Sequence, residues 1–286
     1  WAAAAAPEDL AKARALYFSG DVLKSAETFD AAVKTSSGDA SAWLDGALAW
    51  AESGRPDKAV AWNRKAAALS SGGEARAALG WSLLRVEKAA EADAEFTLAL
   101  AREPDLPAAL LGAGRAKLAL GKAAESVPLL KRAAAFAPQQ TLADFHLGRS
   151  HEALGDTAAV AEDYRRAVNS DSYFNEGRDP LTRAYLRQKR YNEAWRQLSR
   201  LAEAEPSARL TRAMLDKIRP LLTGSAEPRL VTGRGPVAAP DALSQTSEGG
   251  IPIIRVGIAT TAMGRPRPRV SVTIRGSGSW KVHDLK

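Results

Sequence analysis

Small and large apolar residues recur along the chain with the spacing of paired helices. The clearest segment, residues 73–106, has two stripes in which steps of three and four residues keep the positions on one helix face. The stripe of its first helix is Leu79, Gly80 and Leu83, and that of its second helix is Ala92, Phe96 and Ala99. The small residues let the two helices approach closely, so this segment predicts a helix-turn-helix unit.

Five further segments repeat this order of positions with a period of about 34 residues, the range of helical repeat proteins. They are 6–39, 40–72, 107–140, 141–174 and 175–206. Four of them have a glycine at the same place, where a helix end favours a left-handed residue. These glycines are Gly20, Gly54, Gly121 and Gly155, and we place Lys88 and Lys189 there in the other two units. Prolines at 104, 138 and 206 are expected to end the second helix of a unit.

This periodic pattern resembles the tetratricopeptide-repeat (TPR) family over residues 6–206. The resemblance implies an all-α, right-handed superhelical solenoid of about six repeats that acts as a protein-interaction scaffold. Residues 207–223 are predicted to form a terminal capping helix.

One outward position of the first helices carries arginine at a 34-residue spacing, in Arg115, Arg149 and Arg183. Trp81 is its equivalent in the segment 73–106, and we expect Arg85, Phe145 and Arg187 to lie nearby on the concave surface. Because guanidinium groups bind carboxylates in a bidentate manner, this set predicts a groove for a protein or an acidic peptide. The alternative is a solvated helix face whose arginines pair with local Asp and Glu.

The sequence of the repeats contains no clear catalytic motif and no clear metal-ligand motif. The chain has no cysteine, and His146 and His151 are five residues apart rather than the three or four that align two ligands on a helix. Gly112 and Gly114 hint at a nucleotide loop, but no strand precedes them and Gly114 fills a repeat position. We therefore expect no cofactor, no metal and no catalytic residue in the repeats, and a core role for His151. A cluster of tryptophans is interpreted as core, with a stacking platform as the alternative: Trp43, Trp50 and Trp62.

Charge and composition change after residue 223. The net charge is +7, and residues 224–286 hold nine Lys/Arg against four Asp/Glu, so +5 lies there. Residues 224–250 have the Gly, Pro, Ser and Thr content of a linker. Residues 251–286 then alternate apolar and polar positions with a period of two, which predicts strands. Nucleic-acid binding ranks last, because no element interleaves basic and aromatic residues, and no segment has the length of apolar sequence that spans a membrane.

The strings IPIIRVGIAT (251–260) and GSGSWKVHD (276–284) resemble the opening of SpoIID/LytB-type domains. That family acts on peptidoglycan as lytic transglycosylases or as amidase enhancers, which implies peptidoglycan or an amidase as further partners. The family's catalytic glutamate region has no counterpart here, so any enzymatic activity is expected beyond Lys286. The chain begins at Trp1 rather than Met, and we expect it to be part of a longer periplasmic or extracytoplasmic protein. The alternative is a stand-alone, cytoplasmic TPR adaptor without a cell-wall role.

Overall fold

The computed structural model describes residues 7–34, 39–171, 174–204 and 208–223. Helices account for most of these residues, and no strand occurs among them. The all-α prediction is thus confirmed for this part of the chain, whereas the predicted linker (224–250) and β fragment (251–286) lie outside it. The helices are α1 (Pro7–Phe18), α2 (Val22–Ala32), α3 (Ala40–Glu52), α4 (Pro56–Leu69), α5 (Gly73–Arg85), α6 (Ala89–Arg102), α7 (Pro107–Ala119), α8 (Ala123–Ala133), α9 (Ala137–Leu154), α10 (Thr157–Ser170), α11 (Arg178–Arg187), α12 (Tyr191–Ala204) and α13 (Arg209–Ile218), with 3₁₀ turns η1 (Asn175–Gly177) and η2 (Arg219–Leu221).

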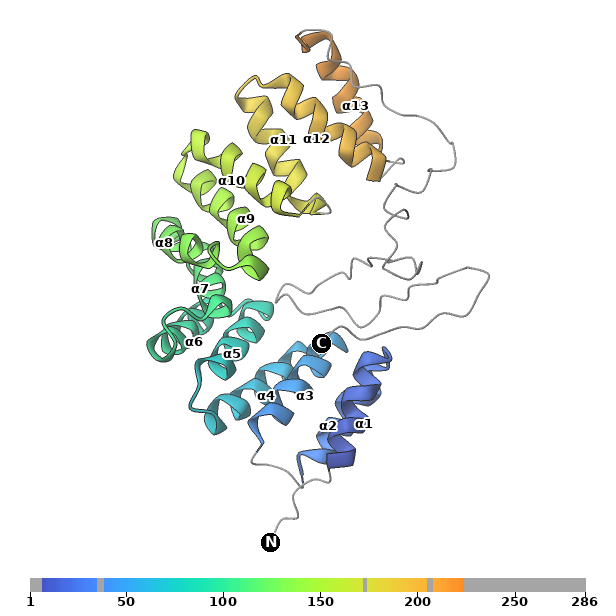
Figure 1. Ribbon diagram of the computed structural model, residues 1–286, viewed down its shortest axis with the longest axis vertical. Coiled ribbons are helices and arrows are strands. Elements are labelled where there is room, and N and C mark those ends of the chain that lie inside the picture. Colours follow the sequence, from blue (N-terminus) through green and yellow to red (C-terminus); the bar gives the residue numbers. More distant parts are fainter. Residues whose placement is uncertain (1–6, 35–38, 172–173, 205–207, 224–286) are drawn as a thin grey trace, which may run out of the picture.

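Successive helices pack as hairpins that stack into one arc from α1 to α13 (Figure 1). The first helices of neighbouring hairpins also contact one another, as α5 does α7 and α7 does α9. These first helices lie on the inner side of the arc, and α6 and α8 lie on the outer side (Figure 1). The inner side, called the inner face below, is therefore built mainly from α3, α5, α7, α9 and α11.

Small residues on the first helices set the distance within each hairpin. A Cβ atom placed on Gly80 would lie 2.7 Å from the Phe96 ring, and one on Gly148 would lie 2.7 Å from the Tyr164 ring. Real Cβ atoms do not approach so closely, so the aromatic ring of the second helix occupies the space that a side chain would need. The predicted pairing of a small residue on the first helix with a large residue on the second is what lets the two helices of each hairpin pack closely.

The turns of the hairpins contain left-handed residues at the predicted spacing, with one correction. Gly54 and Gly121 have φ of +83° and +73°, as expected for a helix end. Lys189 also adopts a positive φ, of 58°, but in the third hairpin the left-handed residue is Glu87, at φ 62°, and not Lys88. The second unit is one residue shorter than the period, so extrapolation by 34 residues from Gly54 overshoots by one.

The prolines follow the prediction only in part. Pro104 comes after α6 has ended at Arg102, as expected. Pro138 instead occupies the first turn of α9, five residues after the end of α8 at Ala133, so it begins a helix rather than ending one. Proline is tolerated there because the first helical N–H groups have no partner within the helix. Pro206 lies outside the described residues.

The core runs through the stack as three adjoining groups of buried side chains. The last of these includes Leu215 and Ile218 of α13, which pack against the hairpin α11–α12. Leu210 on the same helix is 82% exposed. No helix in the described ranges is long and apolar enough to cross a membrane.

Candidate functional site

The three arginines singled out by their spacing lie at equivalent points of α7, α9 and α11, and we call Arg115, Arg149 and Arg183 the arginine row. Their helices all belong to the inner face (Figure 1). Each follows the small residue of its helix directly: Gly114, Gly148 and Thr182. Because those small residues point toward the second helix and each helical residue is turned by about 100° from the one before it, the arginine side chains project away from that contact.

Arg115 is partly buried and has an aromatic partner. Its guanidinium carbon lies 4.9 Å from the centre of the Trp81 ring, an attractive cation–π geometry. Burial, together with the nearby charge of Arg149, lowers the pKa of Arg115. No carboxylate among the described residues forms an ion pair with it. Arg115 therefore has a partly desolvated positive charge without a matching anion in the described ranges.

The other members of the row differ in their partners. Arg149 is exposed and, like Arg115, forms no ion pair within the described ranges. Its charge, with that of Arg115, contributes to a strongly lowered pKa of His146, although burial of that ring is the larger cause. Arg183 is paired with Asp179, one turn earlier on α11. The uncompensated charge of the row is thus concentrated on α7 and α9.

Trp81 and Phe145 are parts of the packing as well as of the inner face. The indole N–H of Trp81 donates to the carbonyl of Ala108 at 3.1 Å, and its ring packs edge-on against Phe96 at 5.8 Å. Phe145 is half-buried, and its ring centre lies 5.6 Å from that of Tyr164. Both rings are therefore fixed in position. Trp81, 7% exposed, supports Arg115 from within the packing, and the half-buried Phe145 ring can serve as a rigid contact surface.

Arg85 and Arg187 each pair with a glutamate on the preceding first helix. Arg85 lies 3.6 Å from Glu52, and Arg187 lies 2.9 Å from Glu152. For these two residues the alternative interpretation, arginine paired with local carboxylates, describes the structure. It does not describe Arg115 or Arg149.

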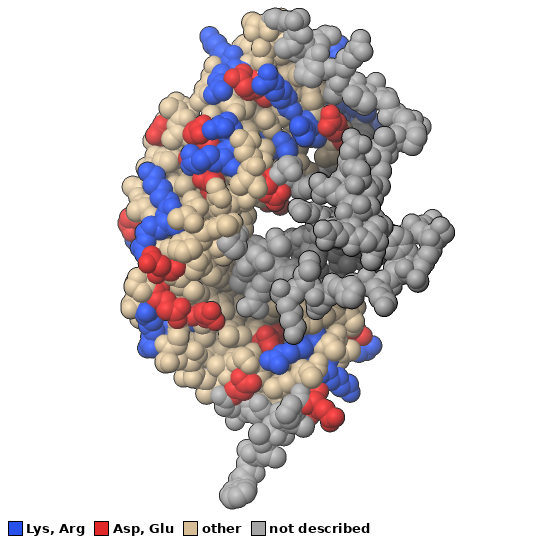
Figure 2. Space-filling model, viewed as in Figure 1, with Lys and Arg blue, Asp and Glu red and all other residues tan. Residues whose placement is uncertain are grey.

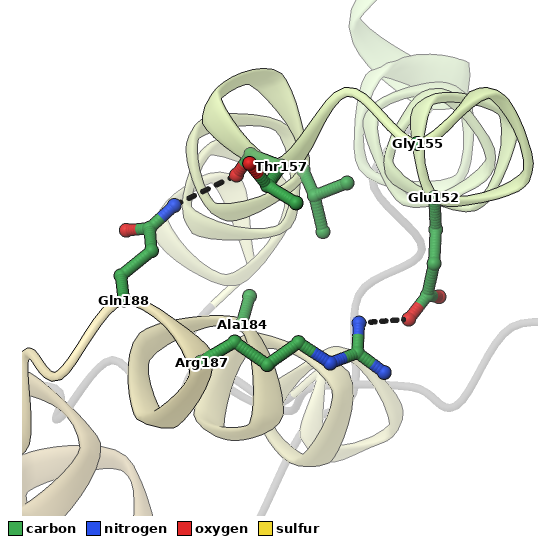
Figure 3. Close-up of a pocket in the computed structure, with 7 residues that line it drawn as sticks. Glu152, Gly155, Thr157, Ala184, Arg187 and Gln188 are labelled. Carbon is green, nitrogen blue, oxygen red and sulfur yellow. Dashed lines mark hydrogen bonds and ion pairs between the residues drawn. The ribbon is translucent and has the colours of Figure 1, made fainter.

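A cleft opens beside Arg187, between α9, α10 and α11 (Figure 3). We call it the α9–α11 cleft, and its lining is Glu152, Gly155, Thr157, Val160, Ala184, Arg187 and Gln188. Sequence analysis predicted Arg187 near the groove but not the cleft, because a gap between two hairpins leaves no periodic signal in either one.

The remaining candidates have structural roles. His151 accepts or donates through Nδ1 to Asp163, 2.5 Å away, and Asp163 also pairs with Arg166. Trp50 and Trp62 are 4% and 7% exposed, in agreement with a core role. No group of His, Asp and Glu suited to a metal ion occurs in the described part of the chain.

Charged side chains of both signs are interspersed along the arc on the face shown in Figure 2. Screening by solvent makes such mixed exposed charges weak contributors individually. The described inner-face groups that lack a partner are therefore the strongest candidates for contact with a ligand.

Stacked helical hairpins with a groove-like inner face define a helical-repeat solenoid. A family model described as tetratricopeptide repeat matches residues 10–74, 77–141 and 111–173, more than half of the sequence. The chain belongs to the tetratricopeptide-repeat family, whose members are scaffolds for protein interactions. A search of the curated proteins gave no match.

Solved structures with the same fold share little sequence with this chain. PilW, described as a widely conserved type IV pilus biogenesis factor, has a TM-score of 0.64 at 21% identity, covering 72% of this chain and 96% of PilW. The Cut9 complex with Hcn1 has a TM-score of 0.63 at 15% identity, covering 74% of this chain and 42% of that one. YrrB, described as a TPR protein with an unusual peptide-binding site, has a TM-score of 0.50 at 20% identity, covering 67% and 99%. At these identities the likeness concerns the fold alone.

Proposed function

We propose that the inner face of α5, α7, α9 and α11 binds an extended acidic segment of a partner protein. The observation that carries the proposal is the contrast among the inner-face arginines. Arg85, Arg183 and Arg187 have carboxylate partners, whereas Arg115 and Arg149 have none among the described residues. A carboxylate from a partner would supply the missing counter-charges at the centre of the face.

Packing of the site favours a ligand that fits without rearrangement. Arg115 is held against Trp81, and the Trp81 ring is anchored by its own hydrogen bond to α7. A side chain already held in its binding geometry loses little conformational entropy when it binds. Phe145, also fixed by packing, offers apolar contact beside the charges.

The test is a triple variant, Arg115→Gln, Arg149→Gln and Arg183→Gln, titrated with a fluorescein-labelled peptide of six alternating Asp and Glu residues. Charge-assisted hydrogen bonds contribute about 1.5–3 kcal/mol each, so binding should weaken by a factor of ten or more, at about 1.4 kcal/mol per decade. The matched control, Arg64→Gln, Arg132→Gln and Arg165→Gln, removes three exposed arginines of the second helices and should bind as the wild type does. Equal affinities for both triple variants would contradict the proposal.

A cell-envelope role is a second proposal, and its support is the resemblance of residues 251–286 to SpoIID/LytB-type domains. On this proposal the protein is periplasmic or extracytoplasmic, the repeats recruit a partner, and the following domain acts in peptidoglycan remodelling, with peptidoglycan or an amidase bound there. The alternative is a stand-alone adaptor for acidic peptides. Sequencing the gene beyond the codon for Lys286 distinguishes them: a glutamate-bearing SpoIID-like core favours the first, and a stop codon or an unrelated domain favours the second.

A further inference from the structure

The α9–α11 cleft combines an apolar floor with a polar rim (Figure 3). Val160 and Ala184, both 4% exposed, come from α10 and α11 and form the floor. The empty volume of the cleft is about 450 Å³, part of which is open to solvent. A concave site with an apolar floor and a few fixed polar groups at its rim is of the kind that accepts a side chain or a small ligand.

Hydrogen bonds across the cleft hold its rim in place. Glu152 uses both carboxylate oxygens, since one accepts from Arg187 at 2.9 Å and the other from the Tyr164 hydroxyl at 3.1 Å. The amide nitrogen of Gln188 donates to the carbonyl of Thr157 at 2.7 Å (Figure 3). The two edges of the cleft are thus tied together by contacts that a ligand does not need to break.

One donor group at the rim is left over. A guanidinium has five N–H groups, and within the described ranges Arg187, whose side chain is 57% exposed, uses one of them, for Glu152. The others are available to a carbonyl oxygen. A charged ligand group of either sign would meet a like charge at the rim, from Glu152 or from Arg187, so the chemistry favours a neutral group with a carbonyl beside it.

We propose that the α9–α11 cleft binds one small aliphatic side chain, of about the size of valine, whose neighbouring backbone carbonyl accepts a hydrogen bond from Arg187. Which molecule supplies this side chain rests on the proposed function: it belongs to the same partner segment whose carboxylates face the arginine row. The cleft lies between α9 and α11, the helices that hold Arg149 and Arg183, so one extended segment reaches both. The partner is thereby narrowed from any acidic segment to one with an aliphatic residue close to its acidic residues.

The cleft can be tested without the acidic part of the ligand. The full 286-residue chain, with ¹³C-labelled Ala and Val methyl groups, is titrated with N-acetyl-valine methylamide and followed by NMR. The methyl signals of Val160 and Ala184 should shift with saturation in the millimolar range expected for so small a ligand, whereas N-acetyl-asparagine methylamide should leave them in place. Unshifted Val160 and Ala184 signals with the valine probe, or equal shifts with both probes, would overturn the proposal.

Two variants separate filling of the cleft from damage to the fold. Thr157→Phe introduces a ring from an exposed position on the rim and should abolish the valine-induced shifts. Ala158→Phe introduces the same ring at the next exposed position, which does not line the cleft, and should preserve them. Shifts that persist in Thr157→Phe would also count against the site.

A second titration connects the cleft with the arginine row. The labelled acidic peptide is extended by one to four glycines and then by either valine or asparagine. At one spacer length valine should bind about tenfold more tightly than asparagine, since burying such a side chain stabilises a complex by at least that factor. If the acidic peptide binds but no spacer gives valine an advantage, the shared ligand is wrong and the proposed function stands. If the acidic peptide fails to bind while the valine probe still shifts Val160, the proposed function is wrong and the cleft stands as a separate site.

Discussion

His146 is a buried imidazole in an environment that disfavours its charged form. The residue is 5% exposed, and its Nδ1 atom has no hydrogen-bond partner in the part of the chain that the structure describes. Burial, Arg115 and Arg149 all lower its pKa, in that order of importance. The ring is therefore neutral in the folded protein at a pH where it is partly protonated in the unfolded chain.

This difference predicts a loss of stability on acidification. Because the folded pKa is lowered, the unfolded chain binds more protons, and the stabilising contribution is complete above the unfolded pKa, near 6.5. It declines as pH falls below that value, by at most about 1.4 kcal/mol per pH unit. Urea unfolding at pH 7.5 and pH 5.5 should show this loss in the wild type.

The comparison with His146→Gln isolates the effect of this residue. Other groups titrate too, and burial of Asp144 raises its pKa, which acts in the opposite direction. The measurement is therefore the difference between wild type and variant at the two pH values. A variant that loses as much stability between pH 7.5 and 5.5 as the wild type would show that His146 is not responsible.

Sequence alone located the arginine row, since its spacing equals the repeat period, but did not show which of its members are unpaired. The Arg183–Asp179 pair lies four residues apart on one helix and could be suspected from spacing. The Arg187–Glu152 pair joins two hairpins, and its formation depends on how these hairpins stack. Partners that come from different units depend on tertiary geometry, which periodicity does not specify.

At the scale of helices and turns, the period of 34 predicted the left-handed glycines but misplaced one turn. Glu87 adopts φ of 62° in the third hairpin, and its N–H bonds to the carbonyl of Leu84. A left-handed conformation costs a residue with a Cβ atom about 1–2 kcal/mol, whereas glycine adopts it freely. This turn forms because packing of α5 against α6 requires it, not because of local preference.

Replacing Glu87 with glycine should therefore stabilise the protein, by about 1 kcal/mol in urea unfolding at neutral pH. The control is Lys88→Gly at the neighbouring position, where φ is −89°. There glycine relieves no strain and adds flexibility to the unfolded chain, so it should destabilise by about 0.5–1 kcal/mol. The opposite order of stability would indicate that Lys88 is the left-handed residue after all.

At the scale of the whole molecule, the contacts of each hairpin are with the hairpins next to it. Such a chain is stabilised by the sum of its units and their interfaces, and it opens from its ends. Native-state hydrogen exchange should show the greatest amide protection in α5 to α9 and the least in α1 and α13, which among the described helices have neighbours on one side of the stack. Uniform protection along the stack would show a single cooperative unit instead.

One consequence of the repeat reaches beyond stability. Arg115, Arg149 and Arg183 occupy the same place in consecutive units, so the distance between their charges is set by how closely hairpins stack rather than by loops. The inner face thus presents one such charged position per hairpin at a fixed interval. Duplicating or deleting a hairpin would add or remove one position while leaving the interval unchanged. A partner whose acidic residues are spaced by that interval would still match the remaining positions.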